Sequence, residues 1–468
     1  MKAKSKWLAI FLVLGLILAA CGGDGGAEET TTTDGSTDTT EDMTTTTEGD
    51  MTETTAGGAG DIATDVGVDL EAGTITVGLL SDLSGVFSSL VQVIVTGQEV
   101  YWEQVNANGG IGGLQVELLP VDTVYDIPTT VQRYEEIRDE VVAIGHSTGS
   151  PHTVAIVDNG MLEEDGMLAI PLTWYSGWSD DEINSNLLHH GVPYCLEAMN
   201  IFGYLTDQMG DAISTVAIAS NPGDYGLDSH NGAVAAAEAL GLEVVYEAPG
   251  EINAADEATL TEVANGIAGS GADLAFVTTS PGAFGSIFGQ ALAQGYQGVW
   301  SGAGPSYNPA LIGPDSPIAD AIAASTYWSA YYGLWGMDTP GIQEATQLLM
   351  DSGRVDVPIS AYFEGFVEAQ IMHAALQRAY DNGDMTRAGV LAAAKSLEEV
   401  DFNGLAPNET YVGSNNDQVQ RASAAIWRPD PAALASGESA GEEILETDYT
   451  HPITEAYEFN ETCYSLEG

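Results

Sequence analysis

The sequence predicts an α/β protein with two doubly wound lobes, each built on a parallel sheet. From about residue 74, short β-branched runs alternate with helical stretches, which is typical of βαβ units. The alternation stops after residue 171 and restarts at residue 215. Two separate series of this kind predict two lobes, and a length of 468 residues also favours more than one domain.

The first series is expected to form the first lobe. Its apolar runs read as strands that are buried on both faces, as in parallel sheets covered by helices. The first helix should end at Asn108-Gly109-Gly110, because glycine commonly follows a helix C-terminus. The expected strands are residues 74–80, 114–121, 141–144 and 167–170, and the expected helices are residues 91–106, 129–140 and 152–164.

The second series repeats the same pattern. The expected strands are residues 215–219, 242–246 and 274–277, and the expected helices are residues 229–240, 258–268 and 283–294. A further strand is expected at residues 323–327 and a long helix at residues 360–380. The chain after the second series is therefore expected to contain folded elements and to be more than a linker.

The first 20 residues read as an export signal. Lys2, Lys4 and Lys6 precede an apolar run that is too short for a confident membrane span and that closes on Leu18-Ala-Ala-Cys21. This ending resembles the bacterial lipobox, in which cleavage exposes the cysteine and lipid is attached to its thiol. An uncleaved anchor, or a secretory signal with an incidental cysteine, is the alternative. In each case the rest of the chain lies outside the cytoplasm.

Residues 21–73 are expected to form a solvated tether. They consist mainly of Thr, Asp, Glu and Gly and contain no Lys or Arg. Such a segment buries too little apolar surface to offset the entropy of ordering it. Its expected role is to hold a folded body away from a lipid anchor on Cys21.

The charge balance excludes several function classes. The chain has 11 Lys+Arg against 69 Asp+Glu, a net charge of -58, which argues against binding nucleic acid or an anionic membrane surface. Lys395 is the only lysine after the leader and lies outside any phosphate-binding loop motif. The acidic surface is either an adaptation to high salt or an ordinary acidic surface.

Cys195 and Cys463 are the only cysteines of the exported body. In an oxidising compartment two cysteines are more often paired than free, so we expect a disulfide between them. The alternative is a pair of free, buried thiols.

The binding loops are expected to follow the strands, because ligands of open α/β sheets bind outside the carboxyl ends of the strands. The loops at these positions are rich in Ser, Thr and aromatic residues and poor in charges, which favours recognition of a small solute over acid–base catalysis. They are residues 81–90, 146–151, 171–178, 221–226, 278–282 and 301–306.

One motif favours an enzyme instead. Gly145-His-Ser-Thr-Gly149 fits the Gly-x-Ser-x-Gly elbow of serine hydrolases, with Ser147 as nucleophile and His373 or His451 as its base. The pattern is short, and the oxyanion-loop glycines are missing upstream, so we expect no enzyme. His189 and His190 lack ligands at metal-binding spacing, and a surface or hinge-side position is expected for them. No metal or cofactor is predicted.

Four segments together carry a resemblance to a known family. They are Val77-Gly-Leu-Leu-Ser-Asp-Leu-Ser-Gly85, Asn106-Ala-Asn-Gly-Gly-Ile-Gly-Gly113, Asp224-Tyr-Gly226 and Ala361-Tyr-Phe-Glu-Gly365. From about residue 74 to residue 429 the chain resembles the leucine/isoleucine/valine-binding family of type I periplasmic solute-binding proteins, which serve ABC transporters. The resemblance implies two lobes joined by a three-crossing hinge, which close on a ligand.

This resemblance also implies the domain organisation and the partners. Lobe I would comprise residues 74–194 with 326–400, and lobe II with the hinge residues 195–325 with 401–429. Residues 430–468 would form a C-terminal tail. The expected partners are a membrane ABC permease and a small solute that is amino-acid-like, an amide or an aromatic carboxylate. A sensor with a signalling partner is the alternative.

Site residues follow from the resemblance position by position. In amino-acid-binding members of the family, two loops bind the ligand carboxylate, and the matching loops of this chain contain hydroxyl residues. Tyr225 of this chain matches a tyrosine in the family's cleft. Ala303 stands where those members have the acidic residue that pairs with the ligand ammonium. The missing acid places an α-amino acid in doubt, since a buried ammonium needs a partner. Trp174, Tyr175 and Trp178, with Trp300 opposite, indicate a larger, flatter solute or, alternatively, packing between the lobes. The other candidate ligand-binding residues are Ser84, Thr148, Ser150, Thr173, Ser176 and Ser280.

Overall fold

The computed structural model describes residues 62–180, 183, 186–437, 439–459 and 463. The leader, Cys21 and most of the expected tether lie outside the described residues. No helix in the described part of the chain is long and apolar enough to span a membrane. Ordered structure begins before residue 74, because Ala63–Thr64 (β1) and Val68–Asp69 (β2) pair with other strands. The expectation of a tether as far as residue 73 is therefore wrong for this stretch.

The first lobe contains a parallel sheet in the order β4-β3-β5-β6. Its strands are Thr74–Ser81 (β3), Gln115–Asp122 (β4), Ala143–Thr148 (β5) and Leu168–Leu172 (β6). Val77 is paired with Leu118 on one side and with Ala143 on the other. Strands β5 and β6 are buried along their whole length, as their continuous apolar sequences predict.

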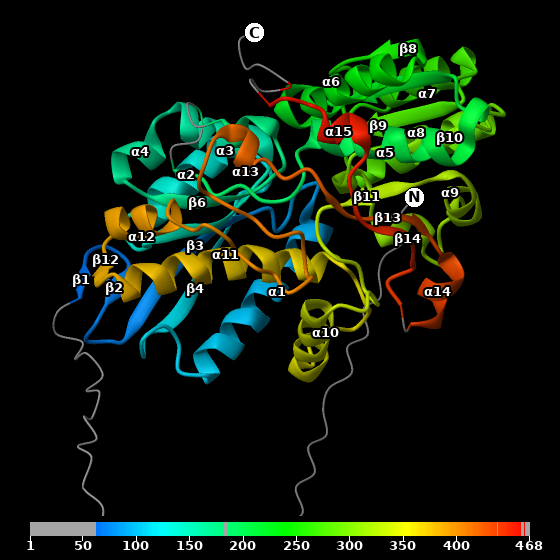
Figure 1. Cartoon of the computed structure of the whole chain (residues 1–468). Coiled ribbons are helices and arrows are strands. Elements are labelled where there is room, and N and C mark those ends of the chain that lie inside the picture. Colours follow the sequence, from blue (N-terminus) through cyan, green and yellow to red (C-terminus); the bar gives the residue numbers. More distant parts are fainter. Residues whose placement is uncertain (1–61, 181–182, 184–185, 438, 460–462, 464–468) are drawn as a thin grey trace, which may run out of the picture. The chain divides into compact units, whose positions relative to one another are not determined.

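Helices cover both faces of this sheet. Helices α2 and α3 pack together on one face, while α1 and α11 pack together on the other (Figure 1). Gly365 allows α11 to approach α1 closely, because a Cβ at this position would lie 2.0 Å from the carbonyl oxygen of Ile94. The helices of the lobe are Ser88–Ala107 (α1), Ile127–Ile137 (α2), Ser150–Asp158 (α3), Met161–Asp165 (α4), Pro340–Ser352 (α10), Ala361–Asp381 (α11) and Arg387–Ala394 (α12).

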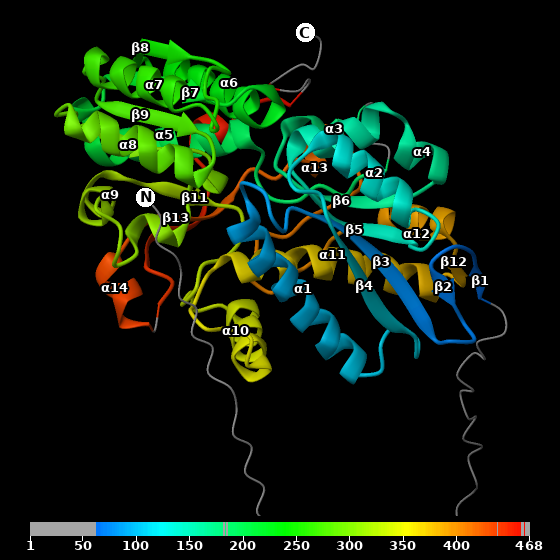
Figure 2. The same cartoon turned by 180° about the vertical axis from the view of Figure 1, so that it is seen from behind.

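The second lobe has a parallel sheet in the order β10-β9-β7-β8 (Figure 2). Its strands are Thr215–Ser220 (β7), Glu243–Ala248 (β8), Leu274–Thr278 (β9) and Val299–Ser301 (β10). Its helices are Tyr194–Met209 (α5), Gly223–Leu240 (α6), Glu257–Ser270 (α7) and Pro281–Ala293 (α8). The predicted α/β fold with a parallel sheet in each of two lobes is therefore confirmed.

A third, antiparallel sheet was not predicted. It joins Trp328–Ala330 (β11), Ser423–Pro429 (β13) and Glu442–Tyr449 (β14) in that order. The strand expected at residues 323–327 is wrong, because the alanine-rich Ala319–Ser325 forms helix α9 and the strand starts at Trp328. Alanine favours helix more than any other residue.

This sheet also changes the predicted domain limits. Because β11 pairs with β13, residues 328–330 belong with the end of the chain rather than with lobe I. Because β14 pairs with β13, residues 442–449 are a sheet strand rather than a separate tail. The chain passes between the lobes three times, at residues 173–193, 331–339 and 395–422.

The remaining elements are short. They are Asp384–Met385 (β12), which pairs with β1, helices Asn415–Gln418 (α13), Pro431–Ser436 (α14) and Pro452–Glu455 (α15), and the 3₁₀ turns Ser176–Ser179 (η1), Gly210–Ala212 (η2), Gly304–Ser306 (η3) and Pro309–Ile312 (η4).

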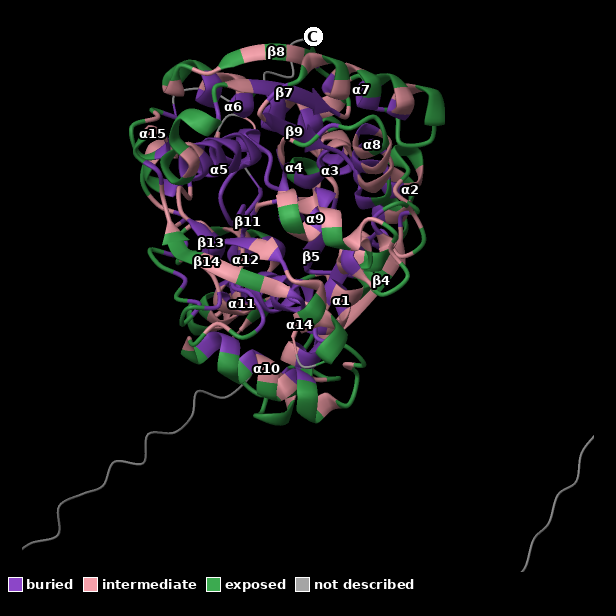
Figure 3. Cartoon of the chain, turned by 90° about the vertical axis from the view of Figure 1, so that its right-hand side faces the viewer, coloured by how far each residue is buried: buried purple, intermediate pink, exposed green. Residues whose placement is uncertain are grey.

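Burial follows the layers of the two lobes. The strands β5, β6 and β9 are buried, while the helices mix buried and exposed positions (Figure 3). The predicted disulfide is present: it joins Cys195 at the start of α5 to Cys463, with their Cα atoms 6.3 Å apart. This pairing fixes the end of the described chain to the second lobe.

Candidate ligand-binding site

The two parallel sheets share one topology that predicts where a ligand binds. In each, the first strand of the series lies between the second and the third, so the connections diverge at the carboxyl ends of the first and third strands. In the first lobe the carboxyl ends of β3 and β5 lie side by side, because the Asp82 backbone amide donates to the Thr148 hydroxyl at 3.2 Å. Crevices of this kind are where open α/β sheets bind ligands.

A cavity of about 110 Å³ lies at this point and is lined by residues of both lobes and of the third sheet. Phe87, which directly precedes α1, and Leu90, Val91 and Ile94 on one face of α1 form part of the wall. These four side chains span about two turns of helix, or roughly 10 Å. No Lys, Arg or His is among the described residues that line the cavity. The cavity is therefore mainly apolar and has no cationic side chain.

Hydroxyl groups gather where α3 begins. Thr148 and Ser150 line the cavity on either side of Gly149, whose φ of 90° lets the strand turn into the helix. The Ser150 and Thr173 hydroxyls are hydrogen-bonded to each other. The amides of a helix N-terminus and nearby hydroxyls together form a common site for an anionic group. This end of the cavity can donate hydrogen bonds to a carboxylate, and it also holds the carboxyl group of Asp224, which is hydrogen-bonded to Ser150 and whose pKa burial raises to about 7.

The second lobe presents the ring of Tyr225 to the cavity rather than its hydroxyl. The Tyr225 hydroxyl donates to the Thr279 carbonyl oxygen at 3.0 Å and lies 3.2 Å from the Ser306 hydroxyl. The ring packs edge-on against Phe87 of the first lobe, with centroids 6.3 Å apart. Tyr225 thus contributes apolar contact across the two lobes.

Trp174 forms a flat part of the wall. It stacks on Tyr331, with ring centroids 3.8 Å apart and planes 8° apart. Its indole Nε1 is buried and has no hydrogen-bond partner among the described residues. Trp174 therefore offers a ligand an apolar surface, whereas its Nε1 faces Gly191, which does not line the cavity.

Glu197 is a carboxyl group near Ala303 that the sequence did not predict for the site, and other groups of the protein are hydrogen-bonded to it. Glu197 accepts hydrogen bonds from the Gly304 amide at 2.9 Å and from the Tyr331 hydroxyl at 2.5 Å. Burial raises the pKa of Glu197 to about 8, so the group is mostly uncharged at neutral pH. Glu197 does not line the cavity and does not supply the carboxylate that is missing at Ala303.

A second missed carboxyl group does line the cavity. Glu442 begins β14, and its Oε2 accepts a hydrogen bond from the Ser360 hydroxyl. Burial raises the pKa of Glu442 to about 8. Glu442 lies beyond the segment that resembles the family, so no motif pointed to it.

The structure brings some of the predicted site residues to the cavity and leaves others away from it. Thr148, Ser150, Trp174 and Tyr225 line it. Thr173 lies behind Ser150, and Ala303 precedes the cavity-lining Gly304. Of the other candidates, Ser84 is exposed and donates to Asp122 at 2.6 Å, Tyr175 is buried against Trp178, and Ser280 precedes α8.

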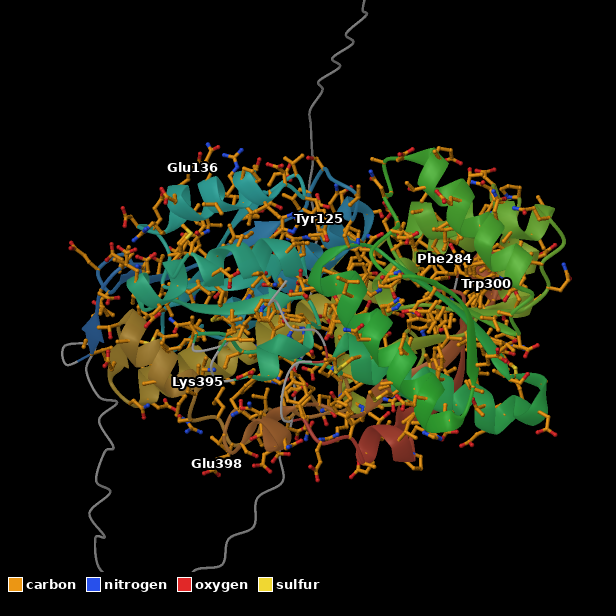
Figure 4. The ribbon with its side chains drawn as sticks, turned by 90° about the horizontal axis from the view of Figure 1, so that it is seen from above. Tyr125, Glu136, Phe284, Trp300, Lys395 and Glu398 are labelled. Carbon is orange, nitrogen blue, oxygen red and sulfur yellow. A yellow bond between two sulfur atoms is a disulfide. The ribbon has the colours of Figure 1, made fainter. Side chains whose placement is uncertain are left out.

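The remaining predicted aromatic residues lie in cores. Trp300 packs in the second lobe against Phe284, Phe288 and Tyr296 rather than opposite Trp174, and Figure 4 shows Trp300 beside Phe284. Neither Trp178 nor Trp300 lines the cavity. In contrast Tyr125, which sequence reasoning did not single out, lines the cavity and packs on Phe87 with centroids 4.8 Å apart.

The positions of Ser147 and of the two candidate histidines do not support the serine-hydrolase alternative. Ser147 lies inside strand β5 rather than at a turn, and its hydroxyl is hydrogen-bonded to Thr153 at 2.8 Å. Of the two candidate bases, His373 is hydrogen-bonded to Tyr101 and His451 lies 3.5 Å from Asp207. Ser147 is a buried core residue.

The histidine pair is buried and not at the surface, but it lies in the 173–193 segment that connects the lobes, as the hinge-side alternative expects. His190 is hydrogen-bonded to Glu364 at 2.5 Å, and its polar atoms lie within 4.8 Å of those of Glu364 and Glu368. Burial opposes the charged form of His190, but the Glu364 carboxylate outweighs it and raises the His190 pKa. A protonated imidazole does not bind metal, so we interpret these residues as an ion pair inside the first lobe.

The two lobes are in contact around the cavity. The Ser176 hydroxyl donates to Asp228 at 2.5 Å, and Asn308 donates to the Ser89 hydroxyl at 3.0 Å. The Cys463 amide also donates to the Ser176 hydroxyl at 3.0 Å. These contacts close the lobes over the cavity.

Solved structures of solute-binding proteins resemble the chain closely in fold. A fatty acid ABC transporter substrate-binding protein from Thermomonospora curvata has a TM-score of 0.76 and 26% identity, and the match covers 85% of this chain and 97% of that one. A branched-chain amino acid ABC transporter protein from Thermus thermophilus with bound valine has a TM-score of 0.67 and 17% identity over 81% of this chain and 97% of that one.

A solute-binding protein from R. palustris in complex with 4-hydroxybenzoate has a TM-score of 0.63 and 17% identity over 81% of this chain and 98% of that one. No curated protein sequence matches the chain significantly.

The family model for periplasmic binding proteins matches residues 74–428, which is well over half of the chain. Its members bind solutes and are not enzymes. The matched residues contain both parallel sheets and most of the cavity wall. The chain therefore belongs to the periplasmic binding protein family and is a solute-binding protein of the ABC transporter type.

Proposed function

We propose that this protein is the lipid-anchored receptor of an ABC importer for a small carboxylic acid with an apolar body. The observation that carries the proposal is the cavity itself. It combines apolar walls with hydroxyls at the N-terminus of α3, and it has no cationic side chain among the described lining residues. A solute with one carboxylate and a hydrocarbon or aromatic body matches this lining.

An α-amino acid fits less well. Its ammonium group needs an ionised carboxylate in a buried site, but Ala303 occupies the expected position. Glu197 is held by Gly304 and Tyr331, and Glu442 has a pKa of about 8. The similarity to the fatty acid binding protein from T. curvata supports an apolar acid.

The anchor and the partner are part of the same proposal. Lipid on Cys21 would hold the protein at the outer face of the membrane, and the residues between Cys21 and Ile62 would connect it to the folded body. An ABC permease would receive the solute when the lobes open. A signalling partner in place of the permease would use the same cavity.

Ligand-induced stabilisation tests the proposed solute. Residues 22–468 would be unfolded thermally with octanoate, benzoate, leucine, valine and octanamide. A ligand at a hundred times its Kd adds about 2.7 kcal/mol to the free energy of unfolding, so octanoate or benzoate should raise Tm, and the two amino acids should not. A shift with leucine or valine alone would reject the proposal.

A pair of variants connects the effect to the cavity. Ser150→Ala removes a cavity hydroxyl and should weaken binding of the acid about tenfold, as expected for one hydrogen bond. Ser84→Ala is the matched control, because Ser84 is exposed and bonded to Asp122 away from the lining. Equal affinities in the two variants would show that the acid binds elsewhere.

A further inference from the structure

The cavity wall carries an unused hydrogen-bond donor away from the α3 hydroxyls. Tyr307 lines the cavity and is 6% exposed, and its hydroxyl has no partner among the described residues. The ring is fixed by packing against Trp328 and Trp427, with centroids 5.5 and 4.7 Å away. A buried, unpaired donor destabilises the protein, and an oxygen atom of a bound ligand would supply the missing acceptor.

Glu442 lines the same cavity as Tyr307. After burial, the charge of Glu442 is the next cause of the raised pKa of Tyr307. Ser360 orients the carboxyl group, because its hydroxyl donates to Glu442 and itself accepts from the Trp335 amide at 2.7 Å. With a pKa of about 8, Glu442 is mostly protonated at neutral pH and has a proton to donate.

The Tyr307 hydroxyl therefore has no acceptor among the described residues. The lining contains no cation among the described residues, so a second ionised carboxylate on the ligand has no charged partner here. A neutral hydroxyl or carbonyl oxygen accepts from both donors without a buried charge.

We propose that the natural ligand carries a second, uncharged oxygen, which binds between Tyr307 and Glu442 while its carboxylate binds at the start of α3. The ligand class is thus an acid with an apolar body and a hydroxyl or carbonyl group distant from the carboxylate. This inference rests on the proposed function and adds to it which acids the cavity prefers.

The test compares acids that differ only in this group. Calorimetry would measure the affinity of residues 22–468 for octanoate and for ω-hydroxyoctanoate. We expect the hydroxy acid to bind about tenfold more tightly, as for one added hydrogen bond in a buried site. Tyr307→Phe should weaken binding of the hydroxy acid and remove most of its advantage over octanoate, whereas Glu442→Gln, which keeps a neutral hydrogen-bond donor, should retain that advantage.

Tyr296→Phe is the matched control. Its hydroxyl is also buried and unpartnered among the described residues, but Tyr296 packs on Trp300 and does not line the cavity. This variant should keep the full preference, and unliganded Tm values would show that all variants fold.

Each other outcome has a definite meaning. Equal binding of both acids by the unmodified chain, or a preference that survives Tyr307→Phe, would overturn the inference and leave the proposed function standing. The inference would also be overturned if ω-aminooctanoate bound more tightly than the hydroxy acid and lost this advantage in Glu442→Gln. Glu442 would then be paired with a cation. Failure of every acid to bind would reject the proposed function and this inference together.

Discussion

Ser176, in the first segment that crosses between the lobes, forms a double hydrogen bond with Asp228 of the second lobe. The Ser176 hydroxyl donates to Oδ1 at 2.5 Å and the Ser176 amide donates to Oδ2 at 3.1 Å. Ser176 follows the last strand of the first lobe, and Asp228 lies in α6 of the second lobe. Both residues are buried. The pair fixes one lobe against the other beside the cavity.

Asp228 should make the stability of the closed protein depend on pH. Burial raises the pKa of Asp228 to about 7, whereas an unfolded Asp titrates near 3.9. The folded state therefore binds the proton more tightly. The stabilisation is fully present below about pH 4 and is lost as the pH rises through about 7, with a slope of roughly 1.4 kcal/mol per pH unit between the two values.

Thermal unfolding between pH 5 and pH 8 checks this dependence. Asp224, Glu197, Glu409 and Glu442, with pKa values of about 7 to 8, act in the same direction. Asp228→Asn should make the fall of Tm with pH shallower. Asp273→Asn is the control. Hydrogen bonds from Ser214 and Thr215 lower the pKa of Asp273, so replacing it should not change the slope of Tm against pH in this range. An unchanged slope in Asp228→Asn would contradict the prediction.

The Cys195–Cys463 disulfide should contribute several kcal/mol to the free energy of unfolding. It closes a loop across 268 positions, and the entropy lost by the unfolded chain grows slowly with loop length. We expect Cys195→Ala with Cys463→Ala to cost about 3–5 kcal/mol, measured by denaturant unfolding. A reducing agent should lower the stability of the unmodified chain by a similar amount and leave the double variant unaffected. Equal stability with and without reductant would show that the bond contributes nothing.

Trp174 should report ligand binding by its fluorescence. It stacks on Tyr331 in the cavity wall, so a bound ligand would contact its ring. Emission should change on titration with a bound acid, and Trp174→Phe should remove most of the change. Trp300→Phe should retain it, because Trp300 packs in the core of the second lobe. The reverse pattern would place the ligand outside this cavity.

Gly365 should be essential for the contact between α1 and α11. A Cβ at Gly365 would lie 2.0 Å from the Ile94 carbonyl oxygen and 2.7 Å from the Gln98 amide nitrogen, so the helices must separate. Gly365→Ala should reduce stability by about 1–3 kcal/mol, as overpacking does. Gly269→Ala in helix α7 is the control, because a Cβ at this position has no atom within 4 Å. This variant should leave the free energy of unfolding unchanged or raise it by up to about 1 kcal/mol. Denaturant midpoints compare the two variants, and equal effects would contradict the argument.

The predictable parts of this protein are those with local causes. The strands of both lobes appear in the sequence as short apolar runs, because a parallel strand is buried on both faces. The loops at Thr148 and Ser150 were predicted because ligands bind at the carboxyl ends of such strands. The pairing of Cys195 with Cys463 was predicted because the exported body holds no other cysteine.

The local pattern failed where partners are distant along the chain. Trp174 and Trp300 both follow or end a strand, yet only Trp174 lines the cavity, since Trp300 is enclosed by helix α8. Periodicity gave no warning of β11, a strand of three residues whose partner β13 lies almost a hundred positions later. A strand that short is defined by its pairing more than by its own sequence.

The sequence by itself determined the layered α/β fold, the cysteine pair and the hydroxyl-rich end of the cavity, because each follows from hydrophobic period, composition or position after a strand. Only the tertiary structure decided what faces the other end. Glu442 reaches the cavity because β14 pairs with β13, and Tyr307 lines it because Trp328 and Trp427 hold its ring. Such positions depend on contacts between segments far apart in the chain, and no local pattern of residues encodes them.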